Sequence, residues 1–218
     1  MILLNNWSIA QRYRGRLVGT AFGLVQSVVW IVLVLGYLSV RVVIAACLFM
    51  VLGWVLGQQY DKVKYYSEKD ALTKLYNRRF IARVFPKLKS LMDRRQKKLG
   101  LFVVDVDQFK KINDMYGHVI GDKVLTELSN LLLANVRNTD FVARWGGDEF
   151  VIVSPDIGVD GADKVITRMK EKLEALRRAN DWTLSVSIGS AIYPDEADTL
   201  EALIHEADQK MYQIKFGE

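Results

Sequence analysis

The sequence has few of the residues that build redox and zinc sites. Its 218 residues include a single cysteine, Cys47, and two histidines. One cysteine cannot form an intramolecular disulfide, and a structural zinc site takes several cysteine or histidine ligands. Neither redox nor zinc chemistry is therefore expected. The chain also lacks internal repeats and low-complexity tracts, so a repeat architecture is not expected either.

Charge is missing from a long stretch near the N-terminus. Between Leu17 and Gly57 the only charged residue is Arg41, in the short polar break Tyr37–Arg41. A helix of this length would measure roughly 60 Å, about twice the hydrocarbon core of a bilayer. We therefore expect two transmembrane helices over residues 17–57, since the apolar region of a cleaved signal peptide is only about 7–15 residues long. A buried hairpin of a soluble core is the alternative, although such helices carry a polar face.

The flanking charges predict the orientation of such a hairpin. Residues 1–69 carry seven Lys/Arg and two Asp/Glu, a net charge of +5, whereas residues 70–218 carry 23 of each. By the positive-inside rule, the basic segment 1–16 and the chain after residue 57 should both be cytoplasmic, at the inner membrane of the cell. The basic excess predicts anionic membrane lipid, and no nucleic acid, as a partner. The cations beside the spans are Arg12, Arg14, Arg16, Lys62, Lys64 and Lys69.

Residues 58–69 are expected to form a helical stalk. The stretch QQYDKVKYYSEKD, Gln58–Asp70, contains no glycine or proline and has good helix formers. The predicted outer turn is only a few residues long, which leaves no room for an extracellular ligand-binding domain. An input signal is therefore expected to act on the membrane segment or through a partner.

Strand-like and helix-like segments alternate in residues 70–218. This order predicts an α+β domain with a ferredoxin-like, or palm-type, antiparallel sheet and flanking helices on one face. The apolar run LGLFVVDVD, Leu99–Asp107, is typical of a buried strand that ends in acids. The other expected elements are a loop from Phe109 followed by a helix of about four turns, a hairpin of 141–145 and 150–153, a helix over 160–179, a strand over 183–193 and a helix over 200–215.

Acidic residues gather at two expected turns of this domain. Asp105 ends the strand 99–107, and Asp148 and Glu149 lie at the tip of the hairpin. If these strands are neighbours, their carboxylates converge and repel one another unless a divalent cation lies among them. Oxygen ligands favour Mg²⁺ or Mn²⁺, which is commonly shared with substrate phosphates. An acidic hairpin tip that is merely solvated is the alternative.

Two glycines, Gly146 and Gly147, come directly before these acids in ARWGGDEFVIVS. Glycine tolerates positive φ and has no side chain. We therefore expect the turn to adopt positive φ and to let a nucleotide approach its backbone.

The stretch RWGGDEF resembles the motif that names the GGDEF family of diguanylate cyclases. Four further stretches are similar to family motifs and occur in the same order, so that the resemblance covers about two thirds of the chain. They are DALTKLYNRR (Asp70–Arg79), DVDQFKKINDMYGHVIGD (Asp105–Asp122), VSIGSA (Val186–Ala191) and EADQKMYQIK (Glu206–Lys215). Residues 70–218 are accordingly identified as a GGDEF catalytic domain.

The resemblance implies an enzyme that condenses two GTP into cyclic di-GMP and releases pyrophosphate. It implies two Mg²⁺ or Mn²⁺ ions per active site, held by Asp105, the carbonyl of Val106 and Asp148. Asp148 is also the implied catalytic base, with Glu149 and Lys110 as further catalytic groups. Each domain would bind one GTP, so a homodimer is required. The implied substrate contacts are Phe109, Asn113, His118, Asp122, Gly146, Gly147 and Lys215, among which Asn113 and Asp122 would contact the guanine edge.

The stretch RNTD, Arg137–Asp140, is similar to the RxxD site through which cyclic di-GMP inhibits members of the family. The resemblance implies that Arg137 binds guanine or phosphate of the product and that Asp140 binds the guanine edge. Arg168 would be a second cation for the same ligand. A local ion pair between Arg137 and Asp140 is the alternative.

The last residues depart from the family pattern. Family members usually continue with Gly-Arg-Asn after the last lysine, whereas this sequence has IKFGE, with Glu218 near the expected arginine. A carboxylate there would repel a triphosphate. A GTP or cyclic di-GMP sensor with little or no turnover, acting on a membrane partner, therefore remains a second hypothesis. Cyclase chemistry on another nucleotide pair is a third, against which Asn113 and Asp122 argue.

Overall fold

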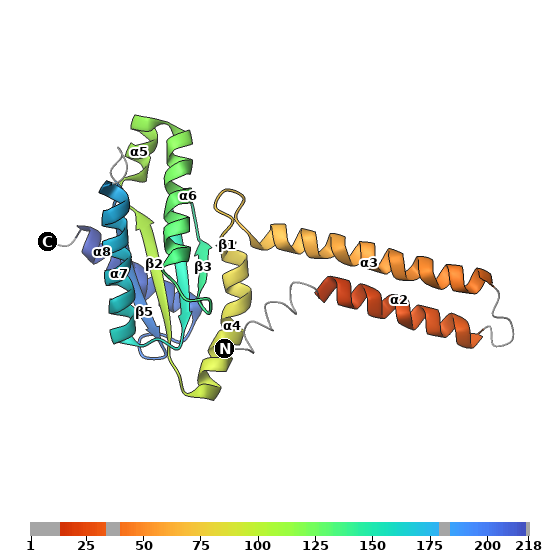
Figure 1. Cartoon of the computed structure of the whole chain (residues 1–218). Helices are drawn as coiled ribbons and strands as arrows, with labels where there is room; N and C mark the ends of the chain where they lie inside the picture. The colour runs from red at the N-terminus through yellow and green to blue at the C-terminus, as the bar shows by residue number, and fades with distance from the viewer. Residues whose placement is uncertain (1–13, 34–39, 179–183, 217–218) are drawn as a thin grey trace. The chain divides into compact units, whose positions relative to one another are not determined.

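The computed structural model describes residues 14–33, 40–178 and 184–216. The chain divides into two compact units, residues 1–67 and 68–218. The first unit contains helix α2 (Arg14–Leu33) and nearly all of helix α3 (Val40–Glu68), as Figure 1 shows. Of the elements in the described residues, the second unit contains the strands and the other helices.

Helices α2 and α3 approach each other through small residues. A Cβ atom added to Gly19 would lie 2.2 Å from the carbonyl oxygen of Gly53, and one added to Gly23 would lie 3.2 Å from the Cα atom of Met50. Such close contact between backbones is typical of helix pairs in membranes. The large apolar side chains lie on the outside instead, and they include Phe22, Leu24, Trp30, Leu48, Leu52 and Leu56.

One helix in the described ranges is long and apolar enough to cross a membrane. It is the part of α3 from Arg41 to Asp61, and only 11% of its most apolar window is buried. The apolar part of α2, Val18–Ile31, is shorter. The break Tyr37–Arg41 lies largely outside the described residues. Two spans over residues 17–57 therefore stay a prediction.

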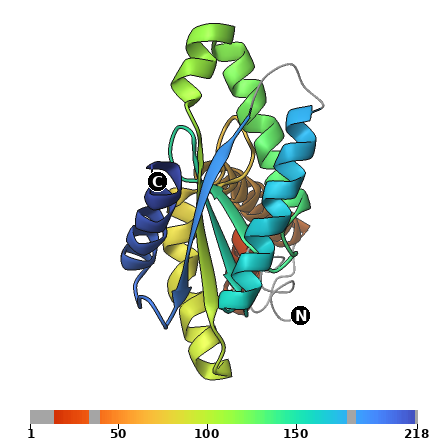
Figure 2. The same cartoon turned by 90° about the vertical axis from the view of Figure 1, so that its left-hand side faces the viewer.

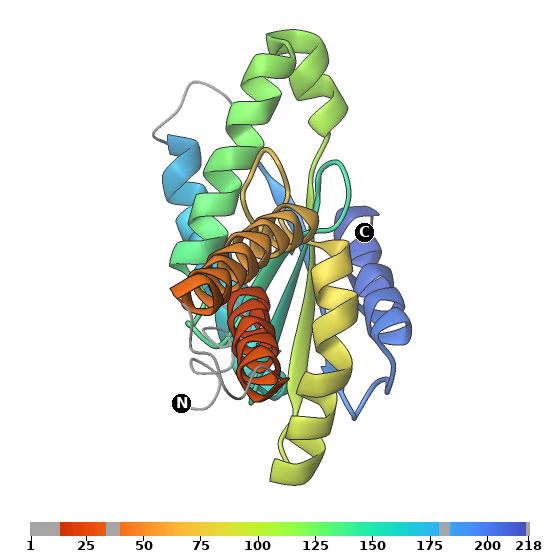
Figure 3. The same cartoon turned by 90° about the vertical axis from the view of Figure 1, so that its right-hand side faces the viewer.

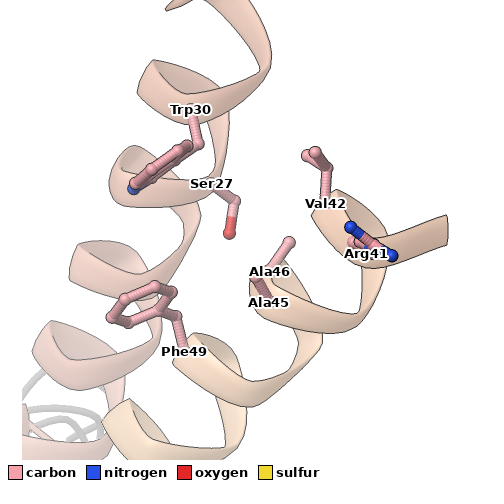
Figure 4. Close-up of a pocket in the computed structure, with 7 residues that line it drawn as sticks. All are labelled: Ser27, Trp30, Arg41, Val42, Ala45, Ala46 and Phe49. Atoms are coloured by element: carbon pink, nitrogen blue, oxygen red, sulfur yellow. The ribbon is translucent and has the colours of Figure 1, made fainter. Parts of the chain in front are cut away.

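A pocket of about 220 Å³ lies between α2 and α3. Figure 4 shows its lining, in which Ser27 and Trp30 come from α2, whereas Arg41 and Phe49 come from α3. The Ser27 hydroxyl donates to the Gly23 carbonyl oxygen at 2.8 Å and is thereby satisfied within its own helix. The pocket has no acidic residue in its lining, so it is separate from the predicted acidic site.

The second unit is built on a sheet of five strands in the order β1-β3-β4-β2-β5. The order of the last four strands is that of a ferredoxin-like fold, and these strands pair antiparallel. The short β1 pairs parallel with β3, so the prediction of a wholly antiparallel sheet was wrong and the sheet is mixed. The strands are β1 (Tyr76–Asn77), β2 (Leu99–Val106), β3 (Phe141–Arg144), β4 (Glu149–Pro155) and β5 (Val186–Tyr193).

Helices cover both faces of this sheet, not one as predicted. Figures 2 and 3 show α4 and α8 on one face and α6 and α7 on the other. Both faces of β2 are therefore buried, which explains why this strand is apolar almost throughout. The helices are α4 (Arg78–Arg95), α5 (Phe109–Tyr116), α6 (His118–Ala134), α7 (Val159–Arg178) and α8 (Leu200–Phe216).

Alternate residues of β2 pack into different layers, as the pleat requires. Phe102 and Val104 belong to the core cluster that includes Leu125 of α6 and Met169 of α7. Their neighbours point to the opposite face, so Asp105 lies on the side of the sheet that α8 covers. The strand thereby delivers its acidic residue to the end of the sheet next to α8.

The predicted loop after Phe109 is helical. Phe109–Tyr116 forms α5, and α6 follows after Gly117, whose φ is 81°. The short α5 was missed because eight residues give little periodicity, and because the glycine with the left-handed backbone separates it from α6. The helix predicted over 160–179 is present as α7, and the strand predicted over 183–193 is present as β5 but begins three residues later, at Val186; residues 179 and 183 lie outside the described ranges.

Candidate functional site

The acidic residues come together where β2 ends and β4 begins. Asp105 of β2 is paired in register with Glu149, the first residue of β4. The backbone amide of Val106 donates to the carbonyl oxygen of Asp148 at 3.3 Å, which fixes Asp148 beside the same strand end. The sheet therefore brings Asp105, Val106, Asp148 and Glu149 to one edge, as the sequence predicted.

These carboxylates lie in a field of excess negative charge. Burial raises the pKa of Asp105, and the neighbouring carboxylates of Asp148 and Asp107 raise it further, against the opposing effect of Lys215. Burial likewise raises the pKa of Glu149, with additional contributions from nearby acids that include Asp105 and Asp148. Carboxylates that disfavour one another's ionisation attract a cation.

The cation beside Asp105 in this structure is a side chain. Lys215 of α8 forms an ion pair with Asp105, and its Nζ atom lies 3.9 Å from Asp107. Burial lowers the pKa of Lys215, but its hydrogen bond to Asp105 and the charges of Asp105, Asp107 and Asp148 outweigh burial, so the pKa is raised. Gly217 and Glu218, which depart from the family pattern, lie outside the described residues.

The oxygen ligands at this edge suit a hard divalent cation, although the side chains do not lie close together in the structure. Within the part of the chain that the structure describes, no three His, Cys, Asp or Glu side chains gather closely enough to hold a metal ion. Asp105 is engaged by Lys215 instead. Carboxylate and carbonyl oxygens from Asp105, Val106 and Asp148 are nevertheless the ligands that Mg²⁺ and Mn²⁺ prefer.

The glycine turn is closed by backbone hydrogen bonds and does not use positive φ. The amides of Trp145 and Gly146 donate to the carbonyl oxygen of Glu149 at 2.8 and 3.3 Å. Among the described glycines only Gly117 has positive φ, so the backbone prediction for Gly146 and Gly147 was wrong. A Cβ atom on Gly147 would meet no atom within 4 Å. Open space at this position is what a nucleotide needs to approach the backbone.

The side chain of Arg144 stabilises the glycine turn by hydrogen bonds. Its Nε and Nη2 atoms donate to the carbonyl oxygen of Gly147 at 3.0 and 2.7 Å, and its Nη1 atom lies 3.2 Å from Oδ1 of Asp70. Asp70 also accepts from the amide and hydroxyl of Thr73, each at 2.8 Å. Burial raises the pKa of Asp70, but the hydrogen bonds from Thr73 and Arg144 outweigh it, so the pKa is lowered.

Four of the predicted substrate contacts, Phe109, Asn113, His118 and Asp122, lie on α5 and α6, which extend beyond the end of β2 in Figure 1. Lys110 is exposed on the first turn of α5, and His118 and Asp122 are exposed on the first turns of α6. Gly121 allows the two helices to meet, because a Cβ atom there would lie 1.9 Å from Oδ1 of Asn113. Phe109 also contacts this position, with its ring 3.3 Å from the same Cβ atom.

Arg137 and Asp140 follow the C-terminal end of α6, and Arg168 of α7 reaches the same segment at Asn135. The backbone amide of Arg137 donates to Oδ2 of Asp140 at 2.9 Å, while Arg168 of α7 donates to the carbonyl oxygen of Asn135. Burial raises the pKa of Asp140, although the hydrogen bonds that it accepts from Arg137 and Thr139 oppose this. Arg137 and Asp140 form a capped turn instead of the alternative side-chain ion pair, and the exposed side chain of Arg137 is available to a ligand.

Sequence reasoning assigned no role to several residues that shape the site. Asp107 accepts a hydrogen bond from the Ser187 hydroxyl at 2.7 Å, and Asp208 of α8 raises the pKa of Glu149. Asp107 occurs two residues after Asp105, and the same alternation that places Asp105 at the strand end points to it. Asp70 and Arg144 are 74 residues apart, and no local pattern indicates that they touch.

Comparison with known proteins connects this site to a family. Residues 67–217 match the family Diguanylate cyclase, GGDEF domain. The chain is 39% identical over 150 residues to diguanylate cyclase DosC of Escherichia coli (strain K12), covering 67% of this chain and 32% of DosC. It is 38% identical over 166 residues to diguanylate cyclase TpbB of Pseudomonas aeruginosa, covering 73% of this chain and 38% of TpbB.

Solved structures agree with this match. The GGDEF domain of PA1120 (YfiN or TpbB) from Pseudomonas aeruginosa superposes with a TM-score of 0.62 at 34% identity, covering 67% of this chain and 95% of that domain. The GGDEF domain of DgcB from Caulobacter crescentus, solved in complex with c-di-GMP, gives 0.63 at 25% identity and covers 69% and 89%. The chain spans about a third of the length of the two relatives named above. It belongs to the GGDEF-domain diguanylate cyclase family.

Proposed function

We propose that this protein is a membrane-anchored diguanylate cyclase that condenses two GTP into cyclic di-GMP and releases pyrophosphate. The observation that carries the proposal is the register of β2 and β4, which sets Asp105 opposite Glu149 and holds Asp148 beside Val106. In a chain whose residues 67–217 match the cyclase family, this edge offers oxygen ligands and a base beside an open glycine turn.

Asp105, Asp148 and the carbonyl of Val106 would hold the divalent ions, two per active site. Bound there, Mg²⁺ or Mn²⁺ would neutralise phosphate charge and lower the pKa of the attacking hydroxyl. Lys215 and Lys110 supply the protein's own positive charge, from α8 and from the first turn of α5. Lys110 is exposed, so it is free to reach a phosphate as a mobile point charge.

The reaction forms one phosphodiester bond at each of two steps. The 3′-hydroxyl oxygen of one GTP attacks the α-phosphorus of the other, and the bond from that phosphorus to the leaving pyrophosphate breaks. The hydroxyl proton passes to the Asp148 carboxylate, which acts as a general base. The same step with exchanged roles closes the ring, so two GTP yield one cyclic di-GMP and two pyrophosphates.

The substrate contacts and the dimer follow from the same geometry. Asn113 and Asp122, on the two helices beyond the strand end, would hydrogen-bond the guanine edge, and His118 lies in the same segment. Each domain offers one such segment, so one domain binds one GTP. Two copies must therefore face each other for turnover, and we propose a homodimer.

We also propose that cyclic di-GMP inhibits the enzyme at Arg137, Asp140 and Arg168. The support is that Arg168 of α7 reaches the carbonyl oxygen of Asn135, two residues before Arg137, whose amide donates to Asp140. Two guanidinium groups and a half-buried carboxyl in this region match a ligand that has both phosphates and guanine edges. The structures of relatives with bound c-di-GMP support a ligand of this kind.

The proposed anchor is the hairpin of α2 and α3. Small residues face inward and large apolar side chains face outward, the reverse of a soluble helix pair. The cations on either side of residues 17–57 support a cytoplasmic catalytic domain and cytoplasmic termini at the inner membrane. Anionic lipid would be the partner of the basic segments beside the spans.

Activity is tested with the full-length protein in nanodiscs, supplied with GTP and Mg²⁺ and assayed for cyclic di-GMP by mass spectrometry. We expect Asp148→Ala to lower turnover by at least roughly a hundredfold, as loss of a general base does. Asp163→Ala, on the exposed side of α7, is the matched control and should leave turnover unchanged. Turnover that survives in Asp148→Ala removes the assigned base. Wild-type protein that binds GTP or cyclic di-GMP without forming product belongs to the sensor class instead.

Membrane insertion is tested separately, by single-cysteine labelling in a Cys47→Ala background. An impermeant maleimide added to spheroplasts should modify Arg41→Cys, in the predicted outer turn, and should not modify Ser90→Cys, in the catalytic unit. Extraction of the chain by alkaline carbonate, or labelling of both positions, would contradict the proposed hairpin.

A further inference from the structure

Helix α4 and the residues directly after it carry a concentrated positive charge. Residues 78–98 contain nine Lys/Arg and one acid, Asp93, for a net charge of +8. Residues 70–218 as a whole contain 23 Lys/Arg and 23 Asp/Glu. The remainder of that range therefore has 14 basic and 22 acidic residues, a net charge of −8. The neutral total conceals a strongly basic element within an acidic domain.

The basic residues of α4 lie along one exposed side. The opposite side packs on the sheet through Phe80, Ile81, Val84, Phe85, Leu88 and Met92, all buried. Arg79, Arg83 and Lys87 follow at intervals of four residues, and Arg94 continues the row two turns later. Arg79, Lys87 and Arg94 are exposed, and Arg83 is half-buried. We call these four residues the α4 stripe, and Figure 3 shows α4 in the outer layer of the unit.

The protein itself neutralises only part of this charge. Arg83 pairs with Glu68 at 2.9 Å, and Lys97 and Lys98 after the helix also form ion pairs. Within the described residues, no acidic side chain lies in ion-pair distance of Arg79 or Arg94. Arg79 and Arg94 therefore present their guanidinium groups to whatever lies outside the domain.

Most of the stripe does not serve the stability of its own helix. Like charges four residues apart repel, and Arg79 lies in the first turn of α4, where the helix dipole favours acids. Arg94 lies in the last turn, where the dipole favours a cation. An anionic partner outside the domain explains why cations occupy the other, unfavourable positions.

A short stretch of chain tethers α4 to the proposed membrane anchor. The apolar segment of α3 ends at Asp61, the helix continues to Glu68, and α4 begins at Arg78. The seven helical residues after Asp61 span roughly 10 Å, and residues 69–77 connect this helix to α4. Such a tether lets α4 come within about one Debye length of a bilayer surface, where anionic headgroups attract basic side chains.

We propose that the α4 stripe docks on anionic lipid headgroups and forms a second contact between the catalytic domain and the membrane. The inference rests on the proposed membrane anchor, but it concerns a different surface from the basic residues beside the spans. Guanidinium and ammonium groups bind phosphate-bearing headgroups by charge and by hydrogen bonds. Docking would limit rotation of the domain about α3.

The experiment measures protection of Ser90, which is exposed on α4 between Lys87 and Arg94. Full-length Cys47→Ala, Ser90→Cys protein is incorporated into nanodiscs of phosphatidylcholine alone or with phosphatidylglycerol, and its reaction with a bulky maleimide is timed. We expect slower reaction on the anionic discs, with protection lost at high salt. Thr167→Cys, on α7, is the matched position and should react at the same rate on both.

Charge-removal variants identify the residues responsible. Arg79→Gln, Lys87→Gln and Arg94→Gln combined should lower the ratio of docked to undocked domain on the order of a hundredfold, given the usual contribution of each cation at such a surface. The matched control, Lys164→Gln, Lys170→Gln and Lys172→Gln on α7, removes the same charge from exposed positions and should preserve protection.

The outcomes separate this inference from the membrane anchor. If the protein enters nanodiscs but Ser90→Cys reacts equally on both lipids, the docking inference is overturned and the anchor stands; a soluble acidic protein is then the partner to consider for the stripe. If the α7 control abolishes protection as strongly as the α4 variant, net charge and not the stripe is responsible, which also overturns it. If the protein does not enter nanodiscs, both proposals fail.

Discussion

Arg144 donates two hydrogen bonds to one acceptor, the carbonyl oxygen of Gly147, and contacts Asp70 with its third nitrogen. The side chains of Arg144 and Asp70 are 17% and 23% exposed, so this ion pair is screened less than one at the surface. Asp70 follows the end of α3 by two residues. A single guanidinium therefore joins the start of the catalytic unit to the turn that carries Asp148.

Replacing Arg144 should impair catalysis without removing any group that touches substrate. We expect Arg144→Ala to lower kcat by roughly ten- to a hundredfold with little change in KM for GTP, because a displaced turn misplaces Asp148. Arg144→Lys should recover little of this, since an ammonium cannot make the forked contact with Gly147. Arg177→Ala, exposed on α7, is the control. Equal kcat in Arg144→Ala and wild type would show that the glycine turn keeps its position without Arg144.

Asp70 should make stability depend on pH in the acid range. Its folded pKa is lowered from the ordinary value of 3.8. The ionised carboxylate therefore contributes stability that is present above the unfolded pKa and is lost as the pH falls through the folded pKa. We expect Asp70→Asn to unfold at lower urea concentration than wild type near neutral pH, with the gap closing below about pH 4. Asp163→Asn should show no such gap, and a gap for Asp70→Asn that persists at low pH would contradict the ion-pair explanation.

Lys215 should compete with a divalent cation for Asp105. Their side chains are 23% and 13% exposed, and Lys215→Met leaves the carboxylate without its partner. We expect nucleotide-free Lys215→Met to bind Mn²⁺ about fivefold more tightly by calorimetry, the equivalent of about 1 kcal/mol. Turnover of GTP should fall, because the same lysine is proposed to bind phosphate. Lys210→Met, on the same helix as Lys215, loses an ion pair with Glu196 and should bind Mn²⁺ like wild type. Weaker Mn²⁺ binding in Lys215→Met would show that the lysine supports the site instead of competing for it.

Product inhibition should depend on both arginines near the end of α6. We expect Arg137→Ala and Arg168→Ala each to raise the cyclic di-GMP concentration for half-inhibition at least tenfold, because each removes a charge-assisted contact worth about 1.5–3 kcal/mol. Turnover at low product should be unchanged, since neither residue lies at the acidic edge. Lys170→Ala, on the same helix as Arg168, provides the comparison. Unaltered inhibition curves in both arginine variants would show that the turn Arg137–Asp140 has a structural role and does not bind the product.

Local patterns in the sequence were enough to predict most elements of the catalytic unit. Short stretches of sequence are enough to indicate these elements. Apolar runs mark β2 and β4, two glycines mark the turn between β3 and β4, and apolar periodicity marks α7 and α8. Placing the acids at one edge needed one further assumption, that β2 and β4 are neighbours, and the register of Asp105 with Glu149 confirms it. The family motifs supplied the residue roles, which periodicity alone could not.

What only the tertiary structure decided depends on contacts between distant residues. Lys215 and Asp105 are 110 residues apart, and Arg144 and Asp70 are 74 apart. The parallel pairing of β1 with β3 and the covering of both sheet faces likewise come from packing. Side-chain electrostatics at the site were therefore beyond the sequence, because a charge is neutralised by whichever partner the fold brings near. The sequence by itself determined which residues could do the chemistry; the fold decided which of them touch.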